Sequence, residues 1–144
     1  MREEGNESVA GLRKEMHDAI ESGAGIYRSN TSLQETCGKL AELRLRYEKV
    51  QLQDRSNVFN TDLTSVLELG AMLDVAQAIA ESALCRKESR GSHQRLDHPE
   101  RDDQNYLKHS LATYRGREPP DVSYCDVVIT RSKPAERVYG GAAA

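Results

Sequence analysis

The sequence contains 144 residues, of which 20 are Lys or Arg and 23 are Asp or Glu, for a formal net charge of −3. This balance excludes a general nucleic-acid-binding protein, which needs a surplus of cations to displace counterions from phosphates. Aromatic residues make up 5% of the chain and Trp is absent, so the core must consist of aliphatic side chains, a composition that favours helices over a β-sandwich.

The sequence predicts no targeting or membrane segment. Residues 1–5 lack the apolar stretch of a signal peptide, and no apolar run approaches the roughly 20 residues that span a bilayer. The three cysteines, Cys37, Cys85 and Cys125, lack the spacing of a zinc or redox motif. We therefore expect a cytoplasmic protein with reduced thiols and no direct insertion into a membrane.

The first two helices are predicted from the spacing of apolar residues. The first is expected within residues 6–22, where an apolar stripe recurs at helical spacing and glycines follow. A second is expected to reach about residue 53, starting at a capping box formed by Ser32 and Glu35. Gly38 within it offers a point where a neighbouring helix could approach closely.

The third helix has the longest apolar pattern. Asn60 or Thr61 can cap its start, and apolar residues then occupy one broad face over residues 63–84. The many alanines indicate a helix packed on more than one side. Gly91 is the predicted C-cap, preceded by cations that complement the negative end of the helix dipole.

The character of the chain changes after Gly91. Short apolar stretches on either side of a turn at residues 116–120 predict two weak strands, a possible hairpin at about residues 106–130. The predicted fold is therefore mainly α: a three-helix bundle in residues 1–91, then an extended C-terminal segment, residues 92–144, with two short β-strands. Because this segment has too little apolar surface for its own core, we expect it to pack on a surface absent from this chain.

A charged cluster follows the third helix, with six Lys or Arg and five Asp or Glu between residues 84 and 110. One interpretation is an anion site, because guanidinium groups bind carboxylates and histidine transfers protons near neutral pH. Its residues would be Arg86, Arg90, His93, Arg95 and His109. The favoured interpretation is a capped helix end whose cations pair with nearby carboxylates: Glu88, Asp97 and Asp102.

Other chemistry receives little support. A metal site would draw on His93, Asp97, His98, Asp102, Asp103 and His109. These side-chain types suit a cation, but their spacing matches no known ligand frame, and Arg95 and Arg101 would repel a metal ion. The sequence also lacks a nucleophile elbow and a phosphate-binding glycine loop. We predict no catalytic, cofactor-binding or metal-binding residue in this chain.

The cluster also has the form of a family signature. Residues 86–97 read RKESRGSHQRLD, and ERDD at 100–103 and LKH at 107–109 follow. These strings closely resemble the C-terminal region of fumarate reductase and succinate dehydrogenase flavoprotein subunits. L-Aspartate oxidases carry a string similar to the KESRG core, but the two later strings favour the respiratory branch. Supporting strings are GIYR at 25–28, KLAEL at 39–43 and VFNTDL at 58–63, and PAERVYGG at 134–141 favours fumarate reductase.

The resemblance implies a parent subunit that holds FAD in a flavin-binding domain beside a capping domain and interconverts fumarate and succinate. An iron–sulfur subunit would carry electrons to or from membrane anchor subunits and quinone, at the cytoplasmic face of the inner membrane. The family's flavin and substrate residues lie upstream of the matched region. We therefore expect this chain to supply scaffold and interface, to bind no cofactor alone and to be inactive in isolation.

Within this resemblance the cluster becomes an interdomain ionic network that would seat the region on the flavin domain. Its predicted members are Arg86, Glu88, Arg90, His93, Arg95, Asp102 and His109. Two alternatives stay open at this point. The chain could be a stand-alone helical module that binds another protein, or a small independent enzyme that acts on a dicarboxylate.

Overall fold

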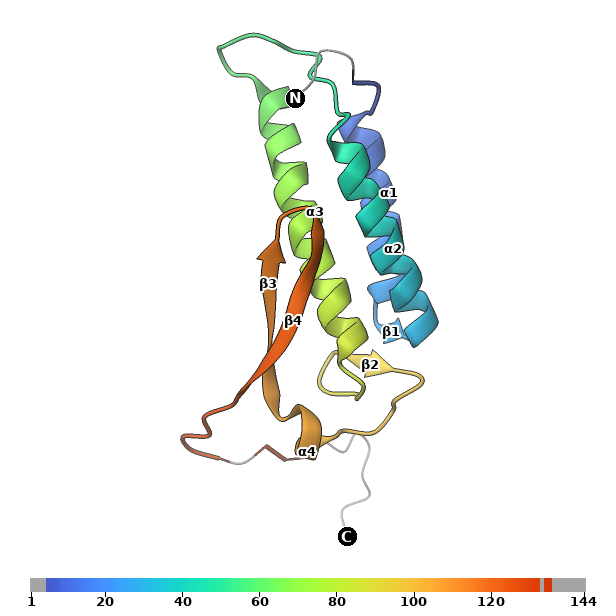
Figure 1. The fold of residues 1–144 in the computed structure, drawn as a ribbon, viewed down its shortest axis with the longest axis vertical. Helices are drawn as coiled ribbons and strands as arrows, with labels where there is room; N and C mark the ends of the chain where they lie inside the picture. Colours follow the sequence, from blue (N-terminus) through green and yellow to red (C-terminus); the bar gives the residue numbers. More distant parts are fainter. Residues whose placement is uncertain (1–4, 133, 136–144) are drawn as a thin grey trace, which may run out of the picture.

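The structure, a computed structural model, describes residues 5–132 and 134–135. Three long helices lie side by side, and a β-hairpin lies along the third (Figure 1). The elements in chain order are α1 (Val9–Ala24), β1 (Tyr27–Arg28), α2 (Asn30–Tyr47), α3 (Thr61–Cys85), β2 (Gln94–Arg95), α4 (Asp103–Tyr106), β3 (Lys108–Arg115) and β4 (Glu118–Asp126). The mainly-α fold class with two C-terminal strands is confirmed. Most of the string at 134–141 lies outside the described residues.

The helix starts show which local signals determined the fold. Asn60 caps α3 as predicted, accepting a hydrogen bond from the Leu63 amide at 2.7 Å. The capping box predicted at Ser32 and Glu35 is wrong, because Ser29 caps α2 and exchanges hydrogen bonds with Ser32. The helix therefore begins one turn earlier than expected.

The end of α3 also differs from the prediction. The helix stops at Cys85, and Arg86 has an extended backbone. Gly91 is not its C-cap; with a φ of 60° it sits in a tight turn between Arg90 and His93, where the left-handed conformation is needed. The chain between Arg86 and Asp103 is thus free to fold back across the ends of the helices.

The core lies between the three helices, and two glycines allow their close approach. Aliphatic side chains from all three fill it: Leu12, Met16, Leu40, Leu43, Val66, Leu69 and Leu73. Gly23 of α1 contacts Thr36 of α2, and Gly70 of α3 leaves room for Tyr47, whose hydroxyl donates to the Val66 carbonyl at 3.0 Å. The proposed close approach at Gly38 is wrong, since a Cβ there would meet no atom within 4 Å.

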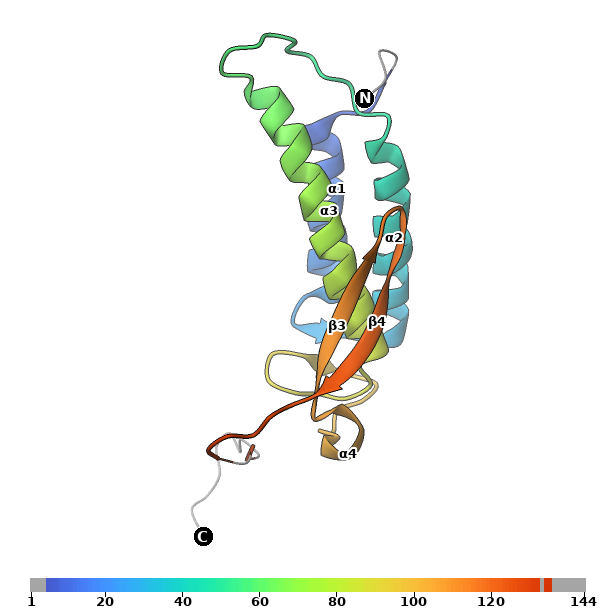
Figure 2. The same cartoon turned by 60° about the vertical axis from the view of Figure 1, so that its left-hand side comes forward.

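Helix α3 occupies the centre of the fold. It contacts α1 and α2 on one side and the hairpin on another (Figure 2). Strands β3 and β4 pair antiparallel, with Gly116 at a φ of 71° in their turn. Among the described helices α3 alone is long and apolar enough to cross a membrane by length and composition, so the prediction that no apolar run approaches that length is wrong for this helix. Its Leu69, Leu73 and Ala80 are nevertheless fully buried against protein.

The two helix glycines give a matched pair of substitutions. Gly23→Ala would place a Cβ against Thr36 and 2.7 Å from the Ser32 carbonyl oxygen, so we expect a loss of about 1–3 kcal/mol in unfolding free energy. Gly38→Ala adds a methyl group in open space and should stabilise the chain by up to about 1 kcal/mol. Urea unfolding of both variants measures the difference, and equal effects would contradict the packing described.

Candidate functional site: a buried ionic cluster at the end of helix α3

The segment after α3 folds back onto the turn between α1 and α2. Strand β2 pairs in parallel with β1, so that Arg95 lies opposite Arg28 (Figure 1). The Leu96 amide extends the pairing by donating to the Arg28 carbonyl at 2.8 Å. This pairing joins residues more than 60 positions apart and crosses the predicted boundary at residue 91.

Arg95 is the central cation of the cluster. Its residue is only 1% exposed, and its guanidinium donates to the carbonyls of Ala83, Leu84 and Arg86 at 3.0–3.3 Å. These carbonyls belong to the last turn of α3 and its cap, where carbonyls lack helical partners. Arg95 therefore supplies the cap that was predicted at Gly91.

Asp97 completes the arrangement around Arg95. Both its oxygens accept hydrogen bonds from the Arg95 guanidinium at 2.8 Å, a bidentate pair. The Arg95 guanidinium and the Asn30 amide, which donates at 2.9 Å, hold the pKa of Asp97 well below its usual range. The carboxylate thereby links α2 to the segment after α3.

Glu88 is the second centre and is fully buried. It accepts hydrogen bonds from Arg86, from Arg90 at 2.9 and 3.0 Å, and from the Asp102 amide at 2.9 Å. Burial raises the pKa of Glu88, but the hydrogen bonds from Arg90, the Asp102 amide and Arg86 outweigh it, so the pKa lies below its usual value. Arg90 also pairs with Asp103 at the protein surface.

Arg86 connects this centre to the hairpin. Its guanidinium donates to the carbonyls of Tyr106 and Lys108 at 2.8 and 2.7 Å. It also lies 5.5 Å from the centre of the Tyr106 ring and 5.7 Å from that of Tyr124, a cation–π arrangement. The base of the hairpin is thus fixed to the end of α3.

His93 is half-buried between two arginines. Its Nδ1 lies 2.9 Å from Nη1 of Arg28 and its Nε2 lies 3.2 Å from the Arg86 carbonyl. Because a guanidinium only donates, Nδ1 must accept and the proton sits on Nε2. Burial lowers the pKa of His93, and the charges of Arg28, Arg95 and Arg86 lower it further, so the ring is neutral at neutral pH.

Six of the seven predicted cluster residues therefore meet in one place, three of them at Glu88 and two at the Arg86 carbonyl. Asp102 is a member only through its backbone amide; the predicted pairing of its carboxylate with a cation is wrong, because that carboxylate accepts hydrogen bonds from Asn105. His109 lies on β3 and is exposed, and its side chain makes no hydrogen bond or ion pair with the described residues. Sequence reasoning missed Arg28, which belongs to the string at 25–28 but is far from the cluster in sequence. It also missed Tyr106 and Tyr124.

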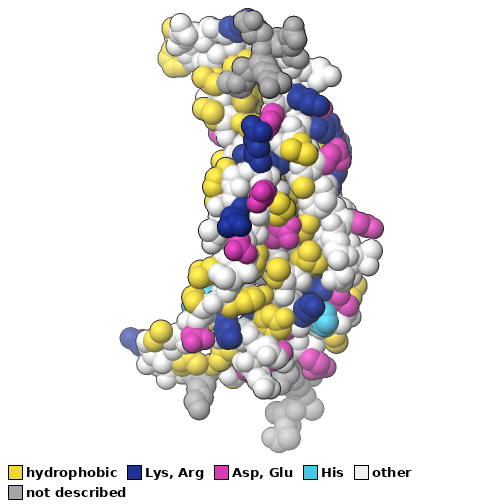
Figure 3. Space-filling view, in the orientation of Figure 1, with side chains coloured by type: hydrophobic (Ala, Val, Ile, Leu, Met, Phe, Trp, Pro, Cys, Tyr) yellow, Lys and Arg dark blue, Asp and Glu magenta, His cyan; other side chains and the backbone are white. Residues whose placement is uncertain are grey.

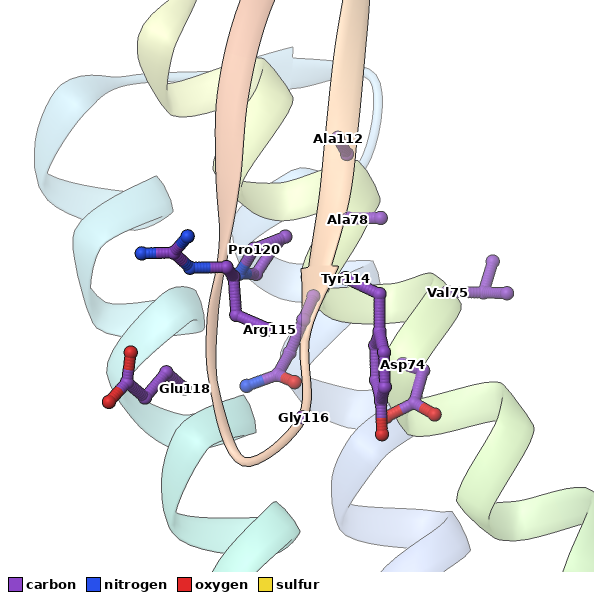
Figure 4. Close-up of a pocket in the computed structure, with 10 residues that line it drawn as sticks. Asp74, Val75, Ala78, Ala112, Tyr114, Arg115, Gly116, Glu118 and Pro120 are labelled. Atoms are coloured by element: carbon purple, nitrogen blue, oxygen red, sulfur yellow. The ribbon is translucent and has the colours of Figure 1, made fainter.

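The cluster is saturated, in the sense that its cations already have hydrogen-bond partners within the protein. The guanidiniums of Arg86, Arg90 and Arg95 are all engaged by carboxylates or carbonyls of the protein. Over residues 5–132 and 134–135 no group of three His, Cys, Asp or Glu side chains could hold a metal ion. A pocket of about 180 Å³ between α3 and the hairpin takes its lining from Asp74, Ala78, Tyr114 and Pro120, and from none of the cluster (Figure 4). This geometry is that of a structural joint.

Comparison with known proteins identifies the region. Residues 13–139 match the family described as fumarate reductase flavoprotein C-term. The chain belongs to this family. It is 54% identical over 142 residues to the fumarate reductase flavoprotein subunit of Haemophilus influenzae and 50% identical over 145 residues to that of Escherichia coli. In both cases the match covers 99% of this chain and 24% of the relative, so the chain spans about a quarter of their length.

Solved structures agree with this assignment to the fumarate reductase flavoprotein C-terminal family. A mutant Escherichia coli quinol fumarate reductase matches with a TM-score of 0.92 at 50% identity, over 99% of this chain and 25% of that chain. Mycobacterium smegmatis Sdh1 in complex with UQ1 matches with a TM-score of 0.71 at 30% identity, over 83% of this chain and 20% of that chain. The resemblance predicted from the motifs is confirmed.

The position of His93 predicts how stability depends on pH. Because burial and the arginines depress its pKa in the folded state, the unfolded chain binds a proton more readily. The contribution of neutral His93 to the unfolding free energy should therefore be fully present above the ordinary pKa of about 6.5, and it should be lost as the pH falls below that value. His93→Gln should flatten the decline between about pH 7 and pH 5. Exposed His109→Gln is the control, and an equal flattening by both would contradict the assignment.

Proposed function

We propose that this chain is the C-terminal structural and interaction region of a fumarate reductase flavoprotein subunit, and that it supplies shape and contacts instead of the catalytic centre. The observation that carries the proposal is the saturated cluster. Its arginines and its histidine resemble an active site in sequence but bind protein oxygens in the structure. The match to a quarter of the length of flavoprotein subunits supports a role within a larger protein.

The parent subunit would bind FAD and interconvert fumarate and succinate. Relatives of this chain are named flavoprotein subunits, and one solved neighbour is a quinol–fumarate reductase with menaquinol molecules. These names support a multi-subunit, membrane-associated complex. Within it we expect an iron–sulfur subunit and membrane anchors, at the cytoplasmic face of the inner membrane. This chain would meet those subunits through the flavin-binding and capping domains of its own parent.

Exposed apolar side chains support an interface role for the tail. Leu111 is 46% exposed and Tyr114 65% exposed on the hairpin, and Val128 is 82% exposed beyond it. Apolar side chains also lie among the charged ones on the face that bears the hairpin (Figure 3). We expect residues 92–144 to lie against the flavin domain. The ionic cluster would hold this surface in a fixed position relative to the helices. Arg90 and Asp103 lie at its partly exposed edge.

A reconstitution experiment tests the proposed function. The chain would be produced alone and together with the part of the Haemophilus influenzae flavoprotein subunit that precedes the matched region. Alone it should show no flavin absorbance and no fumarate reduction with a reduced dye, whereas the pair should retain FAD and reduce fumarate. Flavin or activity in the isolated chain, or full activity of the partner by itself, would overturn the proposal.

One variant tests whether the ionic cluster is needed for assembly of this pair. Arg90→Ala removes one cation from buried Glu88, so we expect co-purification and FAD content of the pair to fall severalfold. Arg117→Ala, which removes an exposed partner of Glu48, should change neither. Unchanged assembly and FAD content in Arg90→Ala would show that the cluster does not seat this region on its partner.

A further inference from the structure

Helix α3 carries apolar side chains that stay exposed beside its contact with the hairpin, and one of them, Val75, also lines the pocket between α3 and the hairpin. Leu67, Ala71, Val75 and Ile79 recur every fourth residue and form one ridge along the helix. Leu67 is 61% exposed, Val75 59% and Ile79 48%. Helices α1 and α2 bury the opposite side of α3. The apolar surface of α3 is therefore wider than the part that these two helices cover.

This ridge forms one wall of a groove between α1 and α3. The groove has a volume of about 390 Å³, and its lining consists almost wholly of apolar side chains, with His17 as the polar member: Met16, His17, Ile20, Ala71, Met72, Val75, Ala76 and Ile79. Buried Met16 and Ala76 belong to the core below it. Towards the start of α3, the ion pair between Arg13 and Glu68 bridges the two helices at 3.6 Å.

The shape of the groove suits a helix. A ridge at four-residue spacing beside a second helix offers the surface into which a third helix packs. From Leu67 to Ile79 the ridge extends for about 18 Å, so a partner helix of about 12 residues would cover it. An occupant also needs an apolar face, because the groove offers few hydrogen-bonding groups.

The position of residues 5–8 indicates where such a helix would come from. The backbone of Glu7 forms a parallel β-bridge with Val50. The Glu7 carboxylate accepts two hydrogen bonds from Arg46, at 2.8 and 3.0 Å. A second hollow, of about 370 Å³, is lined by Ser8 and by residues at the starts of α1 and α3, at the head of the same interhelical face. Residues 5–8 therefore lie at the end of the α1–α3 face at which the groove begins.

We propose that a helix directly preceding this region in the full-length flavoprotein lies in the α1–α3 groove and completes a four-helix bundle. The proposal rests on the proposed function, that this chain is the C-terminal region of such a subunit. The relatives are about four times longer, and the matched family is a C-terminal one, so their additional length precedes this region. The new helix would cover the exposed ridge of α3 and extend the bundle toward the flavin domain.

Site-specific crosslinking in the reconstituted pair tests the proposal. A photoreactive phenylalanine derivative would replace Val75 in the groove or, as control, Leu45 on α2, which is similarly exposed at 60%. Crosslinks from position 75 should map by mass spectrometry to the segment of the Haemophilus influenzae partner that directly precedes the matched region. Crosslinks from position 45 should not reach that segment.

Charge substitutions give an independent readout. Val75→Glu should reduce capture of the partner at least tenfold, whereas Leu45→Glu should change it less than twofold. Because both side chains are exposed, the isolated variants should keep the circular dichroism of the parent chain. Retained capture by Val75→Glu would overturn the proposal.

The remaining outcomes separate this proposal from the proposed function. Fumarate reduction by the pair with crosslinks from position 75 located elsewhere would refute the groove helix alone. A dimer of the isolated chain that Val75→Glu dissociates would assign the groove to a second copy and would also refute it. If the unmodified chain captured no partner at all, both proposals would fail.

Discussion

The fold of this region depends on one buried cation at the end of its central helix. Arg95 satisfies the carbonyls that α3 leaves without partners and is itself neutralised by Asp97. A buried guanidinium is costly unless its charge and its hydrogen bonds are both satisfied, and here both are. Because Asp97 also accepts from the Asn30 amide, the same interaction joins the end of α3 to the start of α2.

The second centre, at Glu88, extends this joint to the hairpin. Arg86 and Arg90 neutralise the carboxylate, and Arg86 also holds the backbone at Tyr106 and Lys108. The charges that give the sequence its resemblance to an anion site are therefore used within the protein. This agrees with the proposal that the region shapes an interface in a fumarate reductase flavoprotein and that the chemistry belongs to the rest of that subunit.

Much of the architecture could be predicted because its signals are local. The cap at Asn60 and the length of the apolar pattern in α3 depend on neighbouring residues only. The contact of Arg28 with His93 could not be derived, because it joins positions 65 apart through the pairing of β1 with β2. The predicted close approach at Gly38 was wrong for the same reason. Which glycine lies against a neighbouring helix depends on the packing of the whole bundle, and the helices approach at Gly23 instead. For the cluster, the sequence predicted that cations pair with Glu88 and Asp97, and the structure shows which cation binds each carboxylate.

Hydrogen exchange at the Leu96 amide, which donates to the Arg28 carbonyl, tests the central claim most directly. If Arg95 makes one cooperative unit of the helices and the following segment, Leu96 should open with the same free energy as core amides of α3 such as that of Leu73. In Arg95→Met both values should fall together, by about 3–5 kcal/mol. Rapid exchange at Leu96 in the unaltered chain, while Leu73 stays protected, would contradict the account.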